Sequence, residues 1–363
     1  MKILLHLFLV LLPVTACSQN APMNPRQDYT QPYTRSSLIA DVAADPAFGE
    51  YGRLIFPVNT GYWSGTTLEQ LQLTWYNYID PDKTVEIVNY MKQHASAGEQ
   101  IFFDIYTETE KQADPAKRNT GLFYFRGGEG KRFAVCNAGG GFSYVGAMHD
   151  SYPHALELGK RGYHAFALIY RPGAQTACED LARAVDVICS MAGEMGIDTS
   201  CYSLWGGSAG ARMAAWVGGY GVPYFGGETA QKAGTVVMQY TGLSDYSAHD
   251  APTYANCGTN DGIASWQTMQ NRLNGMTALG IPTEFHAYQG LPHGFGLGTG
   301  TVAEGWIDDA VRFWEAQMPQ STTATEHVSA AGLNATAYDL QGRPVREGYK
   351  GIIIQNGHKY LNK

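Results

Sequence analysis

Short apolar runs alternate with helix-periodic stretches from about residue 130 to residue 318. The short runs at residues 132–137, 163–170, 202–205, 235–240, 253–257 and 283–288 predict strands. The run at 163–170 is nearly all apolar, as expected for a strand buried on both faces of a parallel sheet. Helical spacing of apolar residues marks residues 181–191, 264–279 and 302–318. This alternation predicts right-handed crossovers and one α/β domain with a doubly wound, mostly parallel sheet.

Two flanks extend this pattern. Residues 45–128 are rich in aromatic side chains, and residues 101–106 and 121–126 predict the first, antiparallel strands of the same sheet. We therefore expect the main domain to span residues 45–319.

After this domain, residues 320–335 form a linker rich in Ser, Thr and Ala, and residues 336–363 predict a small β tail broken by glycines. The tail contains Tyr-Asp-Leu-Gln-Gly at 338–342 and Lys-Gly-Ile at 350–352. In these stretches it resembles the end of the C-terminal sorting domains of type IX secretion, although it is shorter.

The N-terminus has the plan of a targeting segment. Lys2 precedes an apolar stretch at residues 3–13, which is too short for a membrane span, and small residues lead to Cys17. The pattern predicts a signal peptide at residues 1–16, and its end resembles a bacterial lipobox with Cys17 as the acylated first residue. Ordinary cleavage nearby is the alternative. Residues 17–44 would be a linker, and the protein would reside in a bacterial cell envelope, with the lipid anchor as its one membrane contact.

Composition narrows the classes of function. The net charge of -8 is spread along the chain and no basic patch favours a nucleic-acid partner. Five cysteines remain after Cys17, and their apolar surroundings favour buried free thiols, although one disulfide stays possible. No Cys/His cluster has zinc spacing, so we expect no metal. The pattern does not indicate an oligomeric state.

A candidate nucleophile lies at residues 206–210, Gly-Gly-Ser-Ala-Gly, directly after a predicted strand and before a helix-compatible run. This G-x-S-x-G pattern puts Ser208 in a sharp strand-to-helix turn, where neighbouring side chains must be small. The helix N-terminus then points backbone N–H groups at a developing negative charge. A glycine-rich turn without chemistry is the alternative interpretation.

A second glycine run, Gly-Gly-Gly-Phe at residues 139–142, follows an earlier strand. Backbone amides can approach a substrate oxygen when no side chain blocks them, so this run is a candidate oxyanion loop. A tight turn is the alternative.

Chain order selects the base and the acid. His293 lies in Pro-His-Gly-Phe between the last strand and the last helix, and Asp261 follows the preceding strand, as the order Ser, Asp, His requires. Asp245 and Asp250 are rivals that lie one strand too early. Other histidines fall on predicted helices, on strands or in the tail, and His149, His154 and His249 are expected to be surface or capping residues.

With these motifs, the chain resembles the α/β-hydrolase superfamily over roughly residues 123–318, and most closely its carbohydrate-esterase and hormone-sensitive-lipase-like branch. The resemblance implies an α/β-hydrolase fold, no cofactor and oxyanion donors at the amides of Gly140, Gly141 and Ala209. It also implies a serine esterase that removes acetyl or feruloyl groups from carbohydrate. One departure is that Ala138 stands where that branch has a histidine, so this loop would be braced differently.

Other functions stay open on the sequence alone. A serine exopeptidase shares the triad, a lipase would have a larger apolar lid, and a non-catalytic surface protein could keep the fold. The short interval between Ser208 and Asp261 leaves little chain for a cap. We therefore expect the walls of the site to come from other aromatic side chains: residues 62–78, Phe142, Tyr144 and Trp266.

Overall fold

The computed structural model describes residues 24, 27–76, 78–319, 337–339, 343–345, 349–355 and 358–362. The predicted signal peptide, Cys17 and the linker at 320–335 lie outside these residues and stay predictions. Two compact units divide the chain after Gln317, and each is described by itself. None of the described helices is long and apolar enough to cross a bilayer.

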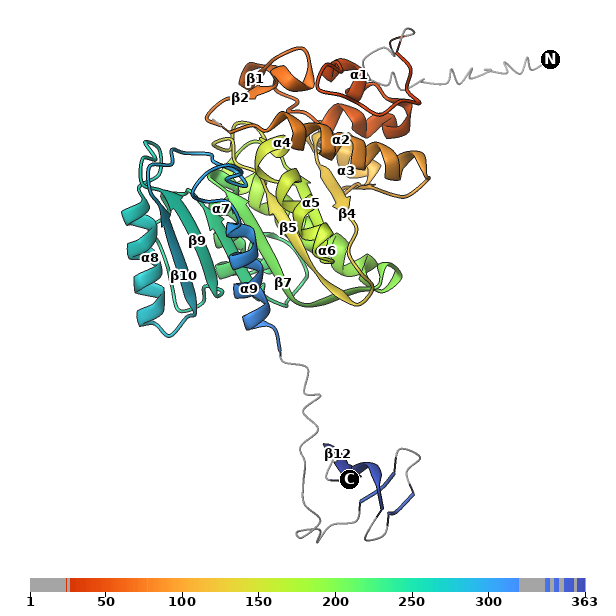
Figure 1. Ribbon diagram of the computed structural model, residues 1–363, viewed down its shortest axis with the longest axis vertical. Helices are drawn as coiled ribbons and strands as arrows, with labels where there is room; N and C mark the ends of the chain where they lie inside the picture. The colour runs from red at the N-terminus through yellow and green to blue at the C-terminus, as the bar shows by residue number, and fades with distance from the viewer. Residues whose placement is uncertain are drawn as a thin grey trace, which may run out of the picture. The chain divides into compact units, whose positions relative to one another are not determined.

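A central sheet organises the first unit (Figure 1). Among the described residues it has eight strands in the order β10-β9-β8-β7-β5-β6-β4-β3. The strands from β10 to β6 are parallel, and β4 and β3 pair antiparallel at the edge, as predicted for the first strands. Their bounds are β3 Phe102–Phe103, β4 Gly121–Phe125, β5 Lys131–Asn137, β6 His164–Ile169, β7 Ile197–Gly207, β8 Thr235–Gln239, β9 Thr253–Gly258 and β10 Thr283–Tyr288.

Helices cover both faces of this sheet because the parallel crossovers are right-handed. Helices α6 and α7 pack on each other on one face, whereas α5 and α9 lie in front of the sheet in Figure 1. The helices are α1 Ile39–Ala43, α2 Pro81–Ser96, α3 Glu108–Ala113, α4 Ala147–Asp150, α5 Tyr152–Lys160, α6 Ala174–Met195, α7 Ala209–Tyr220, α8 Trp266–Ala278 and α9 Trp306–Gln317.

Short elements fill the connections. The 3₁₀ helices are η1 Pro46–Leu54, which is kinked at Gly49, η2 Thr60–Tyr62, η3 Leu68–Gln70, η4 Pro115–Asn119 and η5 Val222–Phe225. A small antiparallel pair, β1 Trp63–Ser64 and β2 Gln72–Leu73, lies in the aromatic N-terminal segment. The second unit contains an antiparallel hairpin, β11 Gly351–Gln355 and β12 His358–Asn362.

Two boundaries differ from the prediction. The last helix begins at Trp306 rather than at residue 302, because the positive φ of Gly298, Gly300 and Gly305 keeps the preceding stretch in turns. The expected linker at residues 17–44 is wrong from Tyr33 on. The Tyr33 side chain is buried and donates a hydrogen bond of 2.7 Å to Asp45, which ties this stretch to the domain.

The interior of the sheet is apolar, and the five described cysteines are free thiols. It also holds three histidines on or near its strands. Burial lowers the pKa of His154 to about 4 and is the main cause that lowers the pKa of His149 and His164. These side chains therefore stay neutral in the fold at pH values where an exposed histidine takes up a proton.

We predict that the protein loses stability as the pH falls from about 6.5 to about 4. In this window the unfolded chain binds protons that the buried histidines do not, so the free energy of unfolding decreases toward low pH. His154 alone accounts for up to about 3 kcal/mol at the lower end. Urea unfolding at several pH values measures this, and His154→Gln should flatten the slope. The exposed His249→Gln serves as a control, and an unchanged slope in His154→Gln would contradict the assignment.

Candidate active site

Ser208 lies in a strained turn between β7 and α7. Its backbone has φ 52° and ψ -116°, which an L-residue adopts only when its surroundings impose it. A methyl group on Gly206 would lie 2.3 Å from the Gly210 carbonyl carbon, and one on Gly210 would lie 2.0 Å from the Asn137 oxygen. Both positions of the motif therefore require glycine, and the Ser208 side chain projects from the carboxyl end of the sheet.

The structure brings the three predicted residues together. The Ser208 hydroxyl lies 3.0 Å from Nε2 of His293, and Nδ1 of His293 lies 2.8 Å from the Asp261 carboxylate. A carboxylate can only accept, so Nδ1 carries the proton and Nε2 is free to accept from the serine hydroxyl. This is the arrangement in which an imidazole can act as a base toward Ser208.

Asp261 is fixed from several sides. Its side chain is fully buried, and Oδ1 accepts hydrogen bonds of 2.8 Å from the backbone N–H groups of Ile263 and Ala264. Burial, followed by the charge of Asp261, raises the pKa of the Cys257 thiol. That thiol remains protonated and lies 3.6 Å from Oδ2 as a further, weak donor. The carboxylate is therefore held in one orientation toward His293.

The glycine loop after β5 lies against Ser208. A methyl group on Gly139 would lie 2.8 Å from Cβ of Ser208. Gly140 and Gly141 have positive φ, and within the described residues their N–H groups donate to no acceptor. Ala209 is the first residue of α7, where a backbone N–H has no partner inside the helix. These three predicted donors are thus available to a substrate oxygen.

This loop is braced by Asp150, a residue that the sequence analysis did not select. Gly139 donates its N–H to the Asp150 carboxylate over 2.8 Å, and Tyr76 donates its hydroxyl over 3.0 Å. Asp150 therefore anchors the loop, which has Ala138 and no histidine before its glycines. The available signal was a His-Asp pair in an apolar stretch soon after the glycines.

The expectation that His149 and His154 are surface or capping residues is wrong, because both side chains are buried. Nε2 of His149 lies 2.9 Å from the carbonyl oxygen of Gly294, the residue after His293. The expected exposure holds for His249. Of the rival acids, Asp250 lies 3.3 Å from the Arg272 guanidinium and belongs to an ion pair.

Aromatic side chains of the N-terminal segment border the loop. Trp75 has a φ of 72° and is 42% exposed, and a methyl group on Gly141 would lie 3.1 Å from its indole ring. Tyr62 stacks on Tyr144, with ring centroids 4.9 Å apart. Phe142 stacks on Trp216 of α7 at a centroid distance of 6.2 Å. Between α7 and β9 the described chain contains only η5 and β8 as regular elements, so no cap rises from that interval.

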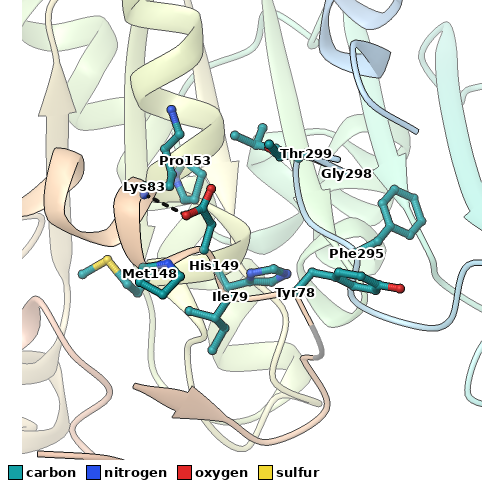
Figure 2. A pocket seen from close by; sticks show the side chains of 12 residues that line it. Tyr78, Ile79, Lys83, Met148, His149, Pro153, Phe295, Gly298 and Thr299 are labelled. Carbon is teal, nitrogen blue, oxygen red and sulfur yellow. Dashed lines mark hydrogen bonds between the residues drawn. The ribbon is translucent and has the colours of Figure 1, made fainter. Parts of the chain in front are cut away.

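A cavity of about 240 Å³ lies beside the His293 loop (Figure 2). Tyr78, His149 and Phe295 are among its lining residues, together with Met148 and Pro153. Ser208, His293 and Asp261 do not line it. The cavity is therefore bordered by the residues that follow the candidate base and is separate from the three triad side chains. Among the described residues, no group of three or more acidic, Cys or His side chains could hold a metal ion.

Comparisons with known proteins address the fold. No family model matches the chain, and no curated protein matches it. Among solved structures, an acetyl ester-xyloside bifunctional hydrolase from Caldicellulosiruptor lactoaceticus aligns with a TM-score of 0.52 and 19% identity. The alignment covers 59% of this chain and 95% of that one.

Two other solved structures align less closely. Esterase Est2 from Thermogutta terrifontis aligns with a TM-score of 0.48 and 19% identity, over 54% of this chain and 89% of that one. MGS-M1, an alpha/beta hydrolase enzyme from a Medee basin deep-sea metagenome library, aligns with a TM-score of 0.47 and 18% identity, over 55% of this chain and 92% of that one. Of the three, the Caldicellulosiruptor lactoaceticus hydrolase has a TM-score above 0.5, and at 19% identity this likeness concerns the fold alone. The chain therefore has the predicted α/β-hydrolase fold, with a doubly wound, mostly parallel sheet.

Proposed function

We propose that the protein is a serine carboxylic-ester hydrolase. The observation that carries this proposal is the continuous hydrogen-bonded chain from Ser208 through His293 to Asp261 at the strained turn. It stands beside a glycine loop whose amide donors are unengaged among the described residues. Nucleophile, base, orienting acid and oxyanion donors are together the set that acyl transfer requires.

In the proposed reaction, the Ser208 oxygen attacks the ester carbonyl carbon while Nε2 of His293 takes the hydroxyl proton. The N–H groups of Gly140, Gly141 and Ala209 donate to the resulting oxyanion. When the intermediate collapses, the C–O bond to the alcohol breaks and His293 returns the proton to the leaving oxygen. Water then repeats the sequence on the acyl-enzyme, which releases the acid and restores Ser208.

We predict that Ser208→Ala and His293→Ala each lower kcat on p-nitrophenyl acetate by a factor on the order of 10⁴ or more, with the fold intact. The double variant should be little worse than either single one, because the residues act as a unit. Initial rates measure this, and Ser190→Ala, an exposed serine of α6, is the matched control. A Ser208→Ala enzyme with more than about a tenth of wild-type activity would refute the nucleophile assignment.

The acyl group is proposed to be small. With no cap between α7 and β9, the wall nearest to the end of the glycine loop is the Phe142 ring, which stacks on Trp216, and we expect it to limit the length of the acyl chain. Each buried methylene gains only about 0.8 kcal/mol, whereas forcing one into a filled pocket costs about 1–3 kcal/mol.

We therefore expect kcat/KM to fall from acetate to butyrate to octanoate esters of p-nitrophenol. A maximum at octanoate would favour a lipase instead. Aminoacyl p-nitroanilides, assayed in parallel, test the exopeptidase alternative, and inactivity on all of these substrates would favour a non-catalytic surface protein.

The alcohol is proposed to be a carbohydrate, with acetyl or feruloyl as the acyl group. Trp75 supports this, because its exposed indole beside Gly141 offers the flat apolar face on which a sugar ring stacks. Its left-handed backbone is a strained conformation of a kind that concentrates at ligand sites. The name of the solved acetyl ester-xyloside hydrolase, which shares the fold, points to the same substrate class.

We predict that Trp75→Ala raises KM for acetylated xylo-oligosaccharides about 2- to 10-fold, the loss expected from one aromatic stacking contact. The kinetics of vinyl acetate, which has no ring, should be unchanged. Trp75→Phe should keep most of the affinity, and Tyr224→Ala, an exposed aromatic residue on η5, is the control. An equal rise in KM for both esters would argue against a sugar platform.

A further inference from the structure

A buried carboxylate that takes no part in the proposed acyl transfer lies under the site. Asp150, the last residue of α4, is 1% exposed and accepts three hydrogen bonds. Oδ2 accepts from the Gly139 N–H over 2.8 Å and from the Tyr76 hydroxyl over 3.0 Å, while Oδ1 accepts from the Tyr240 hydroxyl. No ion pair of Asp150 occurs within the described residues. Its charge is therefore stabilised by neutral donors rather than by a cation.

The position of this carboxylate is set by the turn at Ser208. A methyl group on Gly207 would lie 2.3 Å from each Asp150 oxygen, so the carboxylate fills the space of the side chain that Gly207 lacks. On the other side, a methyl group on Gly139 would lie 2.9 Å from Oδ2. Asp150 thus lies between the residue before the nucleophile and the residue before the oxyanion glycines.

Burying the Asp150 carboxylate costs free energy of desolvation, which hydrogen bonds to both of its oxygens offset. An isolated carboxylate removed from water is costly, and neutral donors to its oxygens favour the charged form. Burial, with the charge of Asp150 as the next cause, raises the pKa of Tyr76 and of Tyr240. Both phenols therefore remain protonated and keep donating. All three donors come from separate segments, so the carboxylate ties these segments to one point.

Through these contacts Asp150 and its neighbours reach both the oxyanion loop at Gly139–Gly141 and the loop that carries His293. A run of three glycines has no side chains to fix its own conformation, yet oxyanion donors act only when they are preorganised. The Tyr240 ring packs edge-on against the His293 ring, with centroids 5.1 Å apart. Next to Asp150, His149 donates from Nε2 to the Gly294 carbonyl, which can only accept. Helix α4 thereby contacts the oxyanion loop and the base loop together.

We propose that Asp150 is a positioning residue, whose carboxylate orients the Gly139–Gly141 loop toward the oxyanion and holds Tyr240 against His293. This inference rests on the proposed ester hydrolysis. It assigns to Asp150 a role that acts through the Gly139 N–H and not through contact with the substrate.

The test is Asp150→Asn, which keeps the size of the side chain but offers a single accepting oxygen. We expect kcat on p-nitrophenyl acetate to fall about 100-fold, as when one oxyanion donor is lost, with KM within about threefold of wild type. The Ki of butylboronic acid, whose tetrahedral adduct on Ser208 mimics the transition state, should rise in parallel with the loss of kcat/KM. A residue that only stabilises the fold would not change this Ki in folded enzyme.

Asp180→Asn is the matched control. Asp180 is equally buried, but it accepts from Tyr106 and pairs with Arg171 at 2.8 Å, and it makes no hydrogen bond to Gly139, Tyr240 or His293 among the described residues. It should lower the melting temperature and leave kcat and Ki unchanged. If Asp150→Asn does not fold, Tyr240→Phe decides, because it keeps the ring on His293 and removes one donor; we expect a kcat loss of about tenfold.

Each outcome is decisive. A wild-type enzyme that hydrolyses the ester, with Asp150→Asn or Tyr240→Phe retaining kcat and Ki within twofold, would overturn the positioning role and leave the proposed function intact. A loss matched by Asp180→Asn would reduce Asp150 to a structural residue. A wild-type protein inactive on every ester would remove the proposed function and this inference together.

Discussion

The first turn of α7 lies so close to the end of β5 that the two backbones touch at Gly210. Because a methyl group there would lie 2.0 Å from the Asn137 carbonyl oxygen, the helix can begin at this place only with glycine. That contact fixes where α7 starts and forces Ser208 into its left-handed conformation, a strain of about 1–3 kcal/mol. The hydrogen bond of 2.9 Å from the Ser208 N–H to Gln239 on the next strand helps to hold it. The position of the Ser208 hydroxyl within reach of His293 and the availability of the Ala209 N–H both follow from this one close approach.

The loops that complete the site are held by two buried carboxylates of similar design. Asp261 accepts from two backbone N–H groups and from His293, and Asp150 accepts from one backbone N–H and two tyrosine hydroxyls. In both cases the cost of removing charge from water is offset by at least three hydrogen-bond donors. Each carboxylate thereby fixes the conformation of its donors: Asp261 orients the His293 imidazole, and Asp150 restrains a glycine loop that has no side chains to pack.

The sequence predicted what local pattern and chain order determine. Buried parallel strands appear as apolar runs, and the turn around Ser208 requires small residues, so the sheet and the nucleophile motif could be recognised without coordinates. Chain order then selected Asp261 and His293, and the structure places both within hydrogen-bond reach.

Contacts between residues far apart in the sequence could not be predicted from these local patterns. The burial of His149 and His154 depends on the elements that pack over them, and no local spacing encodes it. The hydrogen bonds to Asp150 come from Tyr76, 74 positions away, and from Tyr240, 90 positions away, so local spacing does not encode them either. The left-handed backbone of Trp75 likewise depends on its neighbours in space, since an isolated tryptophan avoids that conformation. The domain limits in the C-terminal part remain predictions of the sequence.

The proposed reaction requires that Ser208 becomes covalently acylated during turnover. The most direct measurement is acid quenching of the enzyme during hydrolysis of p-nitrophenyl butyrate, followed by peptide mass spectrometry. We expect a butyryl group on the peptide that carries Ser208, and no such group on Ser208→Ala treated in the same way. Butyryl on a different residue of an enzyme that is turning over substrate, or turnover that persists unchanged in Ser208→Ala, would contradict it.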